Sequence, residues 1–394
     1  MELMDDSIIP RPLISELQNH LLNLSDANLQ EFLAMIHKSI FICNIDKIQV
    51  LIHEIFTATM LQIHFRMVYI DLILGLRTES NSSHLKEAIL DEVMYDHPIY
   101  VKKLYFYILK CLLHRKLFTY NEIEDFITQY KHCSRDELFV LFYTFAHELS
   151  QNKSDTYSIY YPKFHNRFFF NSFDVILVDF DKYQQNNWEL LDRQLVSHIF
   201  KGSVQEMLTT DNLVEFQQVC SNPNFNVNEY MFYSIFSHHE MLASATPIEI
   251  AAFFGSIKIF KFLIVSGVTV NERLVHYAVA GGSVEIIRIC ERSNLPIAGS
   301  FETAVIFRKI PIIQWIKDTF VLSKNELVSS LTQAAIWNSV ISFDCIIDAI
   351  KFHNMNCQTK SEMIDLSYLE TASEKAIEHG NKQFGLYFTQ ITDI

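Results

Sequence analysis

Apolar positions recur every three or four residues through the first 150 residues of the chain, a spacing that predicts helices. The clearest series begins at Ile45 and ends at Leu74, with apolar side chains on one helix face at Ile48, Ile52, Ile55, Thr59, Ile63, Met67 and Ile70. These steps predict about 30 residues of helix with room for one break.

Start signals mark three further helices in this region. Pro98 suits a first helical position, which needs no N–H, and an apolar face follows it. Thr119 with Glu122, and Ser134 with Glu137, have the spacing of a capping box, in which a hydroxyl and a carboxylate bond the free backbone N–H groups. The short connections are typical of stacked helical hairpins. We therefore expect a helical region over residues 1–150.

The pattern stops at a polar, aperiodic stretch over residues 150–156, which is followed by Pro162. Aromatic and β-branched residues then gather between Phe164 and Asp181, which favours either a short strand or a buried connector. Residues 151–210 are thus interpreted as an irregular connector that contains a short strand or a partial repeat.

A helix–turn–helix unit follows, with Thr-Pro-Ile-Glu-Ile-Ala-Ala-Phe-Phe-Gly-Ser over residues 246–256. Thr246 is placed to cap the first helix and Pro247 to begin it. Ala251 and Ala252 are small enough to keep paired helices close. Gly255 supplies the left-handed residue that ends the first helix.

This unit recurs with decreasing similarity. Ala278 and Gly282 occupy the positions of Ala251 and Gly255 in a second copy, since Gly282 follows Gly255 by 27 residues. Further copies begin near residues 304, 334 and 376, and residues 211–228 read as the second helix of an earlier one. The outermost copies could be caps that close an array of about five units.

The first copy resembles the ankyrin repeat, whose opening is threonine-proline-leucine-histidine-x-alanine, with Ile248 in place of leucine and Glu249 in place of histidine. The pattern is also similar to that of an expanded, uncharacterised protist family with a helical N-terminal region before degenerate ankyrin repeats. The resemblance implies an all-α fold, in which an ankyrin-type α-solenoid over residues 211–394 follows the N-terminal helices. It implies no known activity.

Composition narrows the class further. Apolar residues make up 49% of the 394 positions, enough for an ordered core, whereas 9 Gly and 8 Pro are too few for a turn-rich barrel, sandwich or doubly wound sheet. The formal charge of −14 makes a nucleic-acid partner unexpected. Seven cysteines without a C-x-x-C pair predict reduced thiols in an intracellular, cytoplasmic protein. No uncharged apolar run reaches 18 residues, so we expect no membrane span.

Familiar catalytic motifs are missing from the sequence. There is no G-x-G for a dinucleotide, and Leu386 stands where a Walker loop needs lysine. The dipeptides that begin at His53, His147 and His239 lack a second histidine at the zinc-protease spacing. We expect no enzyme, no cofactor and no metal.

Weaker groupings favour structural roles. Asp179 with Asp181 would suit a metal-dependent phosphoryl site, but a strand followed by a solvated turn is the preferred interpretation. The pairs at residues 132–133 and 238–239 would suit part of a metal site, but surface or satisfied histidines are preferred.

Four aromatic residues are the candidate partner-binding set, namely Phe253, Phe254, Phe307 and Trp337. By their place in the repeat they fall just before the turn, at the edge that lines the concave surface of ankyrin proteins, and aromatic residues are common interface anchors. The alternative is that they fill space inside the stack. An acidic surface, with Glu229, Glu240, Glu249 and Glu272, would favour a basic partner, although a solvated acidic face is preferred.

The leading hypothesis is a non-catalytic protein–protein interaction scaffold, because repeats offer a long, shallow groove without converging titratable groups. The alternative is a structural module that forms homo-oligomers through the N-terminal helices. A third, an enzyme within residues 150–210, remains open.

Overall fold

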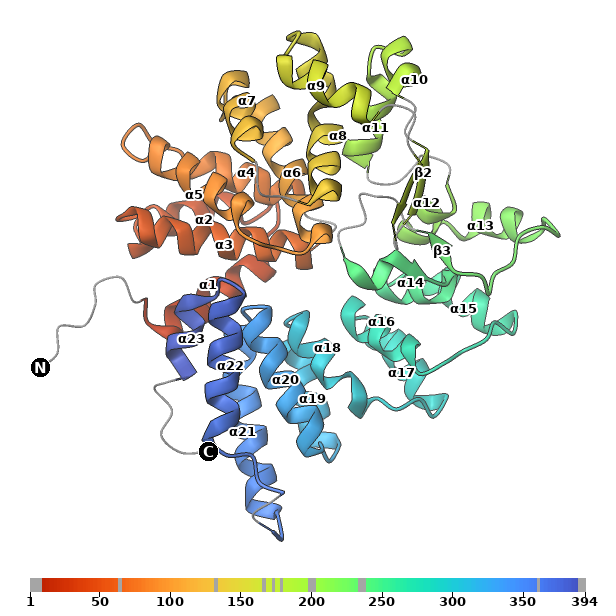
Figure 1. Cartoon of the computed structure of the whole chain (residues 1–394). Coiled ribbons are helices and arrows are strands. Elements are labelled where there is room, and N and C mark those ends of the chain that lie inside the picture. The colour runs from red at the N-terminus through yellow and green to blue at the C-terminus, as the bar shows by residue number, and fades with distance from the viewer. Residues whose placement is uncertain are drawn as a thin grey trace, which may run out of the picture. The chain divides into compact units, whose positions relative to one another are not determined.

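A computed structural model describes residues 9–62, 66–130, 134–164, 168–171, 174–177, 180–197, 203–232, 239–359 and 362–388 (Figure 1). The predicted all-α class is confirmed for these residues, since strands account for only four short segments. The chain divides into two compact units. Unit 1 comprises residues 1–23, 207–229 and 246–394, and unit 2 comprises residues 24–206 and 230–245.

Unit 2 begins with helical hairpins. Its first helices are α2 (Leu29–Ile36), α3 (Ile45–Leu61), α4 (Arg66–Gly75), α5 (Ser82–Met94), α6 (Ile99–His114), α7 (Tyr120–Gln129) and α8 (Arg135–Gln151), with a short 3-10 turn η1 (Ile40–Ile42) before α3. Successive hairpins pack, with α3 against α5, α4 against α6 and α6 against α8. The predicted periodic helix from residue 45 to 74 is confirmed as α3 and α4, and Thr119 forms both bonds of its capping box with Glu122.

The predicted irregular connector over residues 151–210 is mostly helical, which corrects that expectation. It contains α9 (Asp155–Phe164), β1 (Phe168–Asn171), β2 (Asp174–Leu177), α10 (Phe180–Gln185), α11 (Glu189–Ser197) and α12 (Val204–Thr209). The expected strand is half of an antiparallel hairpin, in which Phe168 pairs with Leu177. A second small pairing joins β3 (Met231–Phe232) to β4 (Ser244–Ala245), and η3 (Glu240–Ala243) precedes β4.

Unit 1 is a series of helical pairs. Its helices are α1 (Arg11–Leu22), α13 (Leu213–Cys220), α14 (Pro247–Phe254), α15 (Ile257–Val265), α16 (Arg273–Gly281), α17 (Val284–Arg292), α18 (Phe301–Ile306), α19 (Ile310–Thr319), α20 (Lys324–Ile336), α21 (Val340–Asn356), α22 (Leu366–Glu378) and α23 (Lys382–Phe388), with η4 (Ala298–Ser300) before α18. The first helices of successive pairs contact one another from α14 through α16, α18 and α20 to α22. α1 packs against α21.

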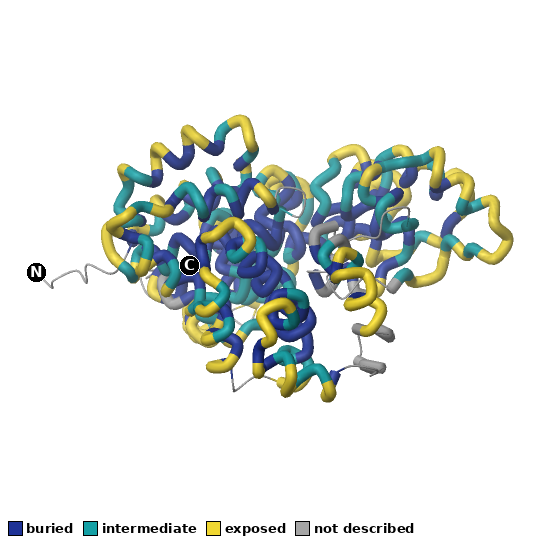
Figure 2. The backbone as a smooth tube through the Cα atoms, turned by 90° about the horizontal axis from the view of Figure 1, so that it is seen from above, coloured by how far each residue is buried: buried dark blue, intermediate teal, exposed yellow. Residues whose placement is uncertain are grey.

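Burial follows this arrangement. In Figure 2 the buried positions lie where helices face each other, and the exposed positions lie mainly at turns and on outer faces. Ala251, Ala252 and Ala278 are fully buried between α14 and α16, as the predicted close approach requires. Each interior is therefore formed by helix-to-helix contact within its unit.

Candidate binding site

The turns between paired helices in unit 1 share one backbone feature, a residue in the left-handed region. These residues are Gly255, Gly282, Arg308, Asn338 and Gly380. The prediction is confirmed at Gly255 and Gly282, where φ is 69° and 78°. We call the five turns, over residues 254–256, 281–283, 307–309, 337–339 and 379–381, the turn row.

Side chains in the turn row bond the backbone of neighbouring pairs. Ser339 Oγ donates to the carbonyl of Val305 at 3.0 Å, and Asn381 Nδ2 donates to the carbonyl of Ala335 at 2.7 Å. Ser256 Oγ donates to the carbonyl of Leu208 at the upstream end. These buried bonds satisfy carbonyls at helix ends and fix the turns next to one another.

Arg308 and Gln18 extend the same network. Arg308 is 2% exposed, and its Nη2 donates to the carbonyls of Trp337 at 3.3 Å and Asn338 at 2.8 Å. Gln18 of α1 donates from Nε2 to the carbonyl of Asn338 at 2.7 Å and accepts from the N–H of Ile341 at 2.9 Å. Neither residue was singled out from the sequence, because their partners lie far along the chain.

Two of the four predicted binding aromatics are interior residues, which corrects the expectation for them. Phe253 is 8% exposed and Phe307 is 2% exposed, and their ring centroids lie 5.7 Å apart in an edge-to-face arrangement. The two rings meet between the end of α14 and the end of α18. They therefore fill space inside the stack, which was the alternative interpretation.

Phe254 and Trp337 are half-buried and remain accessible at the turn row. The Phe254 ring lies 5.3 Å from that of Phe253. Trp337 donates from Nε1 to Gln333 Oε1 at 3.0 Å, which orients its indole on the last turn of α20. Their role as partner-binding anchors stays a prediction.

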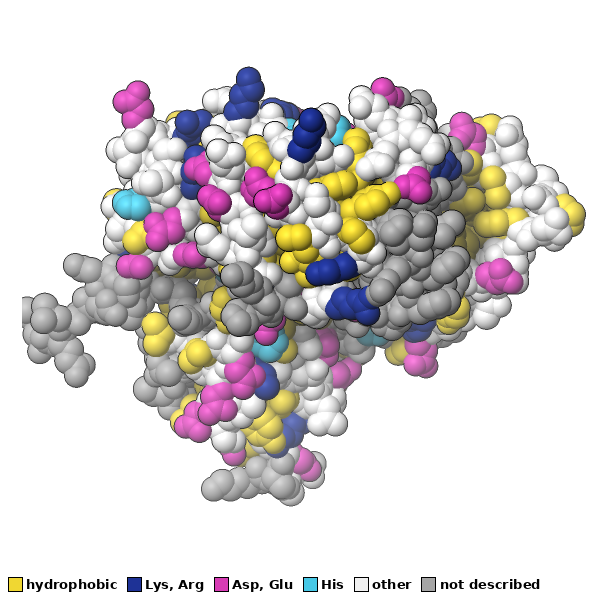
Figure 3. Space-filling view, turned by 45° about the horizontal axis from the view of Figure 1, so that its top comes forward, with side chains coloured by type: hydrophobic (Ala, Val, Ile, Leu, Met, Phe, Trp, Pro, Cys, Tyr) yellow, Lys and Arg dark blue, Asp and Glu magenta, His cyan; other side chains and the backbone are white. Residues whose placement is uncertain are grey.

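Glu249 was expected on an acidic surface, but it is 2% exposed. It completes a capping box with Thr246, because its Oε2 accepts from the Thr246 N–H at 2.8 Å, and Pro247 begins the helix as predicted. Glu229 and Glu272 are exposed. Acidic and basic side chains both occur on the face drawn in Figure 3, with hydrophobic side chains among them.

Among the residues that the structure describes, the most extensive ionic cluster lies in unit 2, and it was not predicted from the sequence. Lys110 on α6 is 4% exposed, and its Nζ lies 3.1 Å from both Glu148 Oε1 and Asp192 Oδ1. His114 Nε2 lies 2.6 Å from Glu148 Oε1, and His147 Nδ1 lies 2.6 Å from Asp192 Oδ2. The chain of contacts ties α6, α8 and α11 together.

Electrostatics keep the buried carboxylate of this cluster ionised. Burial by itself raises the pKa of Glu148, but the hydrogen bond from His114 and the charge of Lys110 outweigh it and lower the pKa to about 2. In the part of the chain that is described, only His147, Glu148 and Asp192 bring three metal-type ligand atoms within 4.8 Å of one another. Lys110 already supplies positive charge to both carboxylates, so a metal ion would have to displace a buried ammonium group.

The remaining predicted metal candidates show structural contacts or fall outside the description. His239 is buried, and its Nδ1 accepts from the Met241 N–H at 3.2 Å at the start of η3. Asp181 is exposed and accepts from the Tyr161 hydroxyl. Asp179, His238 and residues 132–133 lie outside the described residues.

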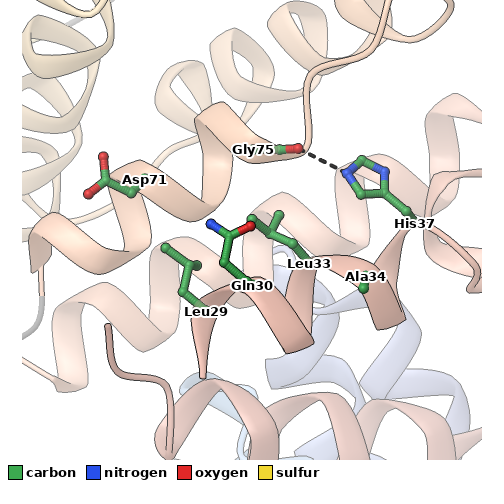
Figure 4. Close-up of a pocket in the computed structure, with 7 residues that line it drawn as sticks. All are labelled: Leu29, Gln30, Leu33, Ala34, His37, Asp71 and Gly75. Carbon is green, nitrogen blue, oxygen red and sulfur yellow. Dashed lines mark hydrogen bonds between the residues drawn. The ribbon is translucent and has the colours of Figure 1, made fainter. Parts of the chain in front are cut away.

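An open hollow of about 570 Å³ lies between α2 and α4 in unit 2 (Figure 4). Leu29 and Leu33 of α2 line one side with His37, the residue after that helix, and Asp71 and Gly75 of α4 line the other. The His37 ring bonds the Gly75 carbonyl at 2.9 Å across it. A β-carbon at Gly75 would lie 2.5 Å from Leu33, so close helix packing rather than a ligand accounts for this glycine.

The comparisons with known proteins add no relative. No protein-family model matches the chain, and a search of curated proteins finds no significant match. Among the helices that are described, none combines the length and apolar character needed to cross a membrane.

Proposed function

We propose that residues 211–394 form an ankyrin-type α-solenoid and that the chain is a non-catalytic protein-binding scaffold. The resemblance of residues 246–256 to the repeat opening supports this, together with the left-handed Gly255 and Gly282 and the capping box of Thr246. In unit 1 the first helix of each pair packs against the first helix of the next pair, as neighbouring units do in repeat arrays.

One observation supports the turn row as the binding surface. Ser339 of the fourth turn and Asn381 of the fifth turn bond carbonyls at the ends of α18 and α20, which fixes these turns against the preceding helix pair. Phe254 and Trp337 remain accessible on the first and fourth turns. Aromatic side chains on a rigid framework lose little conformational entropy on binding and are favoured interface anchors.

The non-catalytic assignment rests on the ionic cluster as well. Its two carboxylates are already bonded to Lys110 and to histidines, which is what a structural ion network requires.

Site-specific photocrosslinking tests this proposal. Benzoylphenylalanine replaces Phe254 or Trp337 in the full chain, which is expressed in its native cell. Val265 and Val321 serve as matched controls, because they are 87% and 94% exposed, the first at the end of α15 and the second in the loop after α19. We expect one discrete partner to crosslink from the two turn-row positions and not from the controls. Equal crosslinking from all four positions would contradict the proposal, and crosslinks to a second copy would favour self-association.

A further inference from the structure

Lys309 is an unusual lysine of the turn row. It is the residue before α19, in the third turn, and its side chain lies over the second turn. A β-carbon at Gly282 would lie 3.3–3.4 Å from Lys309 Cε, Cδ and Nζ. The lysine stem therefore packs on a neighbouring backbone that has no side chain of its own.

Among the described residues, the Lys309 ammonium group has no ion pair or hydrogen bond, whereas two other lysines of unit 1 have carboxylate partners. Lys261 bonds Glu285 at 2.5 Å and Lys375 bonds Glu378 at 2.6 Å. The sequence contains 46 acidic and 32 basic residues, so the chain has enough carboxylates to pair with all of its lysines and arginines.

The position of Lys309 is unfavourable for a positive charge that has no counterion. Burial lowers its pKa, because the surrounding protein replaces part of the water that would solvate the charge. Lys309 also stands at the start of a helix, where the partial charge of the backbone is positive. A carboxylate beside it would offset both effects.

A carboxylate of the chain itself lies just upstream of the turn row. Asp211 accepts from the N–H groups of Lys258 at 3.1 Å and Ile259 at 2.9 Å. Asp211 itself has a left-handed backbone. The left-handed residue of the following turn is Gly255, which has no side chain and so cannot supply a carboxylate to the next helix pair. The chain thus supplies a carboxylate upstream of the first turn, and among the described residues none is paired with Lys309 beside Gly282.

Apolar surface flanks this position. Phe254 lies on the first turn, and Trp337 lies on the fourth, whose backbone carbonyl is bonded by Arg308, the residue next to Lys309. A ligand that reaches Lys309 along the row therefore meets aromatic side chains as well as a charge.

We infer that Lys309 binds a carboxylate of a partner segment in which an acidic residue stands beside an apolar one. Charge complementarity selects this partner, and the inference rests on the proposed binding function of the turn row. It adds the chemical class of the partner and the residue that recognises its charge.

A random twelve-residue peptide library displayed on phage is the probe, and the purified full chain is the target. We expect selected peptides to be enriched in Asp or Glu next to an aliphatic or aromatic residue. Lys309→Met should lose that enrichment and bind a selected peptide at least about tenfold more weakly, and the peptide with Glu replaced by Gln should lose a similar factor with the wild-type chain. Lys258→Met removes an exposed lysine nearby and should change neither result.

Folding is checked in the same experiment by thermal melts. Lys309→Met should melt at or above the wild-type temperature, because it removes a desolvated charge. If Lys309→Met unfolds, Lys309→Gln is used in its place. Unchanged peptide selection and affinity in the Lys309 variant would overturn the inference. If Phe254→Ala and Trp337→Ala still weaken binding in that case, the proposed function stands. If they do not, or if the library yields no binder, the proposed function fails too.

Discussion

Gln18 bonds the turn at Asn338 through its side-chain amide, although 320 residues separate the two along the chain. The amide is fully buried, and its oxygen accepts from the N–H of Ile341. α1 therefore closes one end of the helix that begins at Val340. The contact makes the first described helix a part of unit 1.

Gln18→Ala should destabilise unit 1 by about 1–3 kcal/mol, because a buried N–H and a carbonyl lose a partner. Glu16→Ala, at an exposed position of the same helix, is the control and should change little. Chemical denaturation monitored by circular dichroism measures both. Equal effects of the two substitutions would mean that the amide contributes nothing specific.

The adjacent glycines of the second turn should respond differently to a β-carbon. Gly282→Ala should cost on the order of 1–2 kcal/mol, because φ is 78°. Gly281→Ala should cost more, because its β-carbon would lie 2.4 Å from the Ala252 carbonyl oxygen and 2.6 Å from that of Phe253. Gly299→Ala meets nothing within 4 Å and serves as the control. Denaturation midpoints rank the three variants, and a neutral Gly281→Ala would contradict the close packing of α14 and α16.

The four aromatic residues should separate by burial. Phe253→Ala and Phe307→Ala should each cost roughly 3–5 kcal/mol, as for other buried aromatics. Phe254→Ala and Trp337→Ala should cost much less and weaken partner crosslinking instead. Phe260→Ala, at a fully buried position of α15, gives the reference for a core truncation. If Phe254→Ala melts as early as Phe260→Ala, its ring is core.

Lys110 and Lys86 offer a matched pair of ion-pair tests in unit 2. Lys110→Met leaves Glu148 and Asp192 without their buried cation and should destabilise the unit by about 3–5 kcal/mol. Lys86→Met breaks a more exposed pair with Glu122 and should cost about 1 kcal/mol or less. Thermal melts compare them. A small effect at Lys110 would show that the cluster is dispensable for folding.

His239 should make stability depend on pH. Burial lowers its pKa from 6.5 to about 4, so the folded state binds its proton less readily than the unfolded state does. Its contribution is complete above pH 6.5 and is lost as the pH falls towards 4. His239→Asn keeps an acceptor for the Met241 N–H and should flatten this part of the stability profile. Denaturation at several pH values tests this, and parallel profiles for wild type and variant would contradict it.

Sequence patterns located much of the helical framework because they are local. The period of three to four residues fixed the positions of α3 and α4, and glycine marked the turns at Gly255 and Gly282. The third and fourth turns carry Arg308 and Asn338 in the same left-handed conformation, so glycine could not mark them.

The candidate sites were harder to predict because they depend on distant residues. His147 and Glu148 stood out as a dipeptide, yet their partners Lys110 and Asp192 lie on other helices. Phe253 and Phe254 are adjacent and identical in chemistry. Phe253 is the interior ring because it packs against Phe307 at the end of α18, a contact that the local sequence does not encode. Among the described residues no carboxylate pairs with the partly buried ammonium of Lys309, and no local sequence pattern encodes such an absence.

The docking of α1 on α21 also affects how the chain is made. A ribosome that adds roughly 5–20 residues per second needs about 16–64 s to pass from Gln18 to Asn338, 320 residues later. During that interval the apolar face of α1, with Ile14, Leu17 and Leu21, has emerged before the helix that covers it exists. Nascent chains of this protein therefore present a short apolar segment that chaperones can hold until α21 has been synthesised.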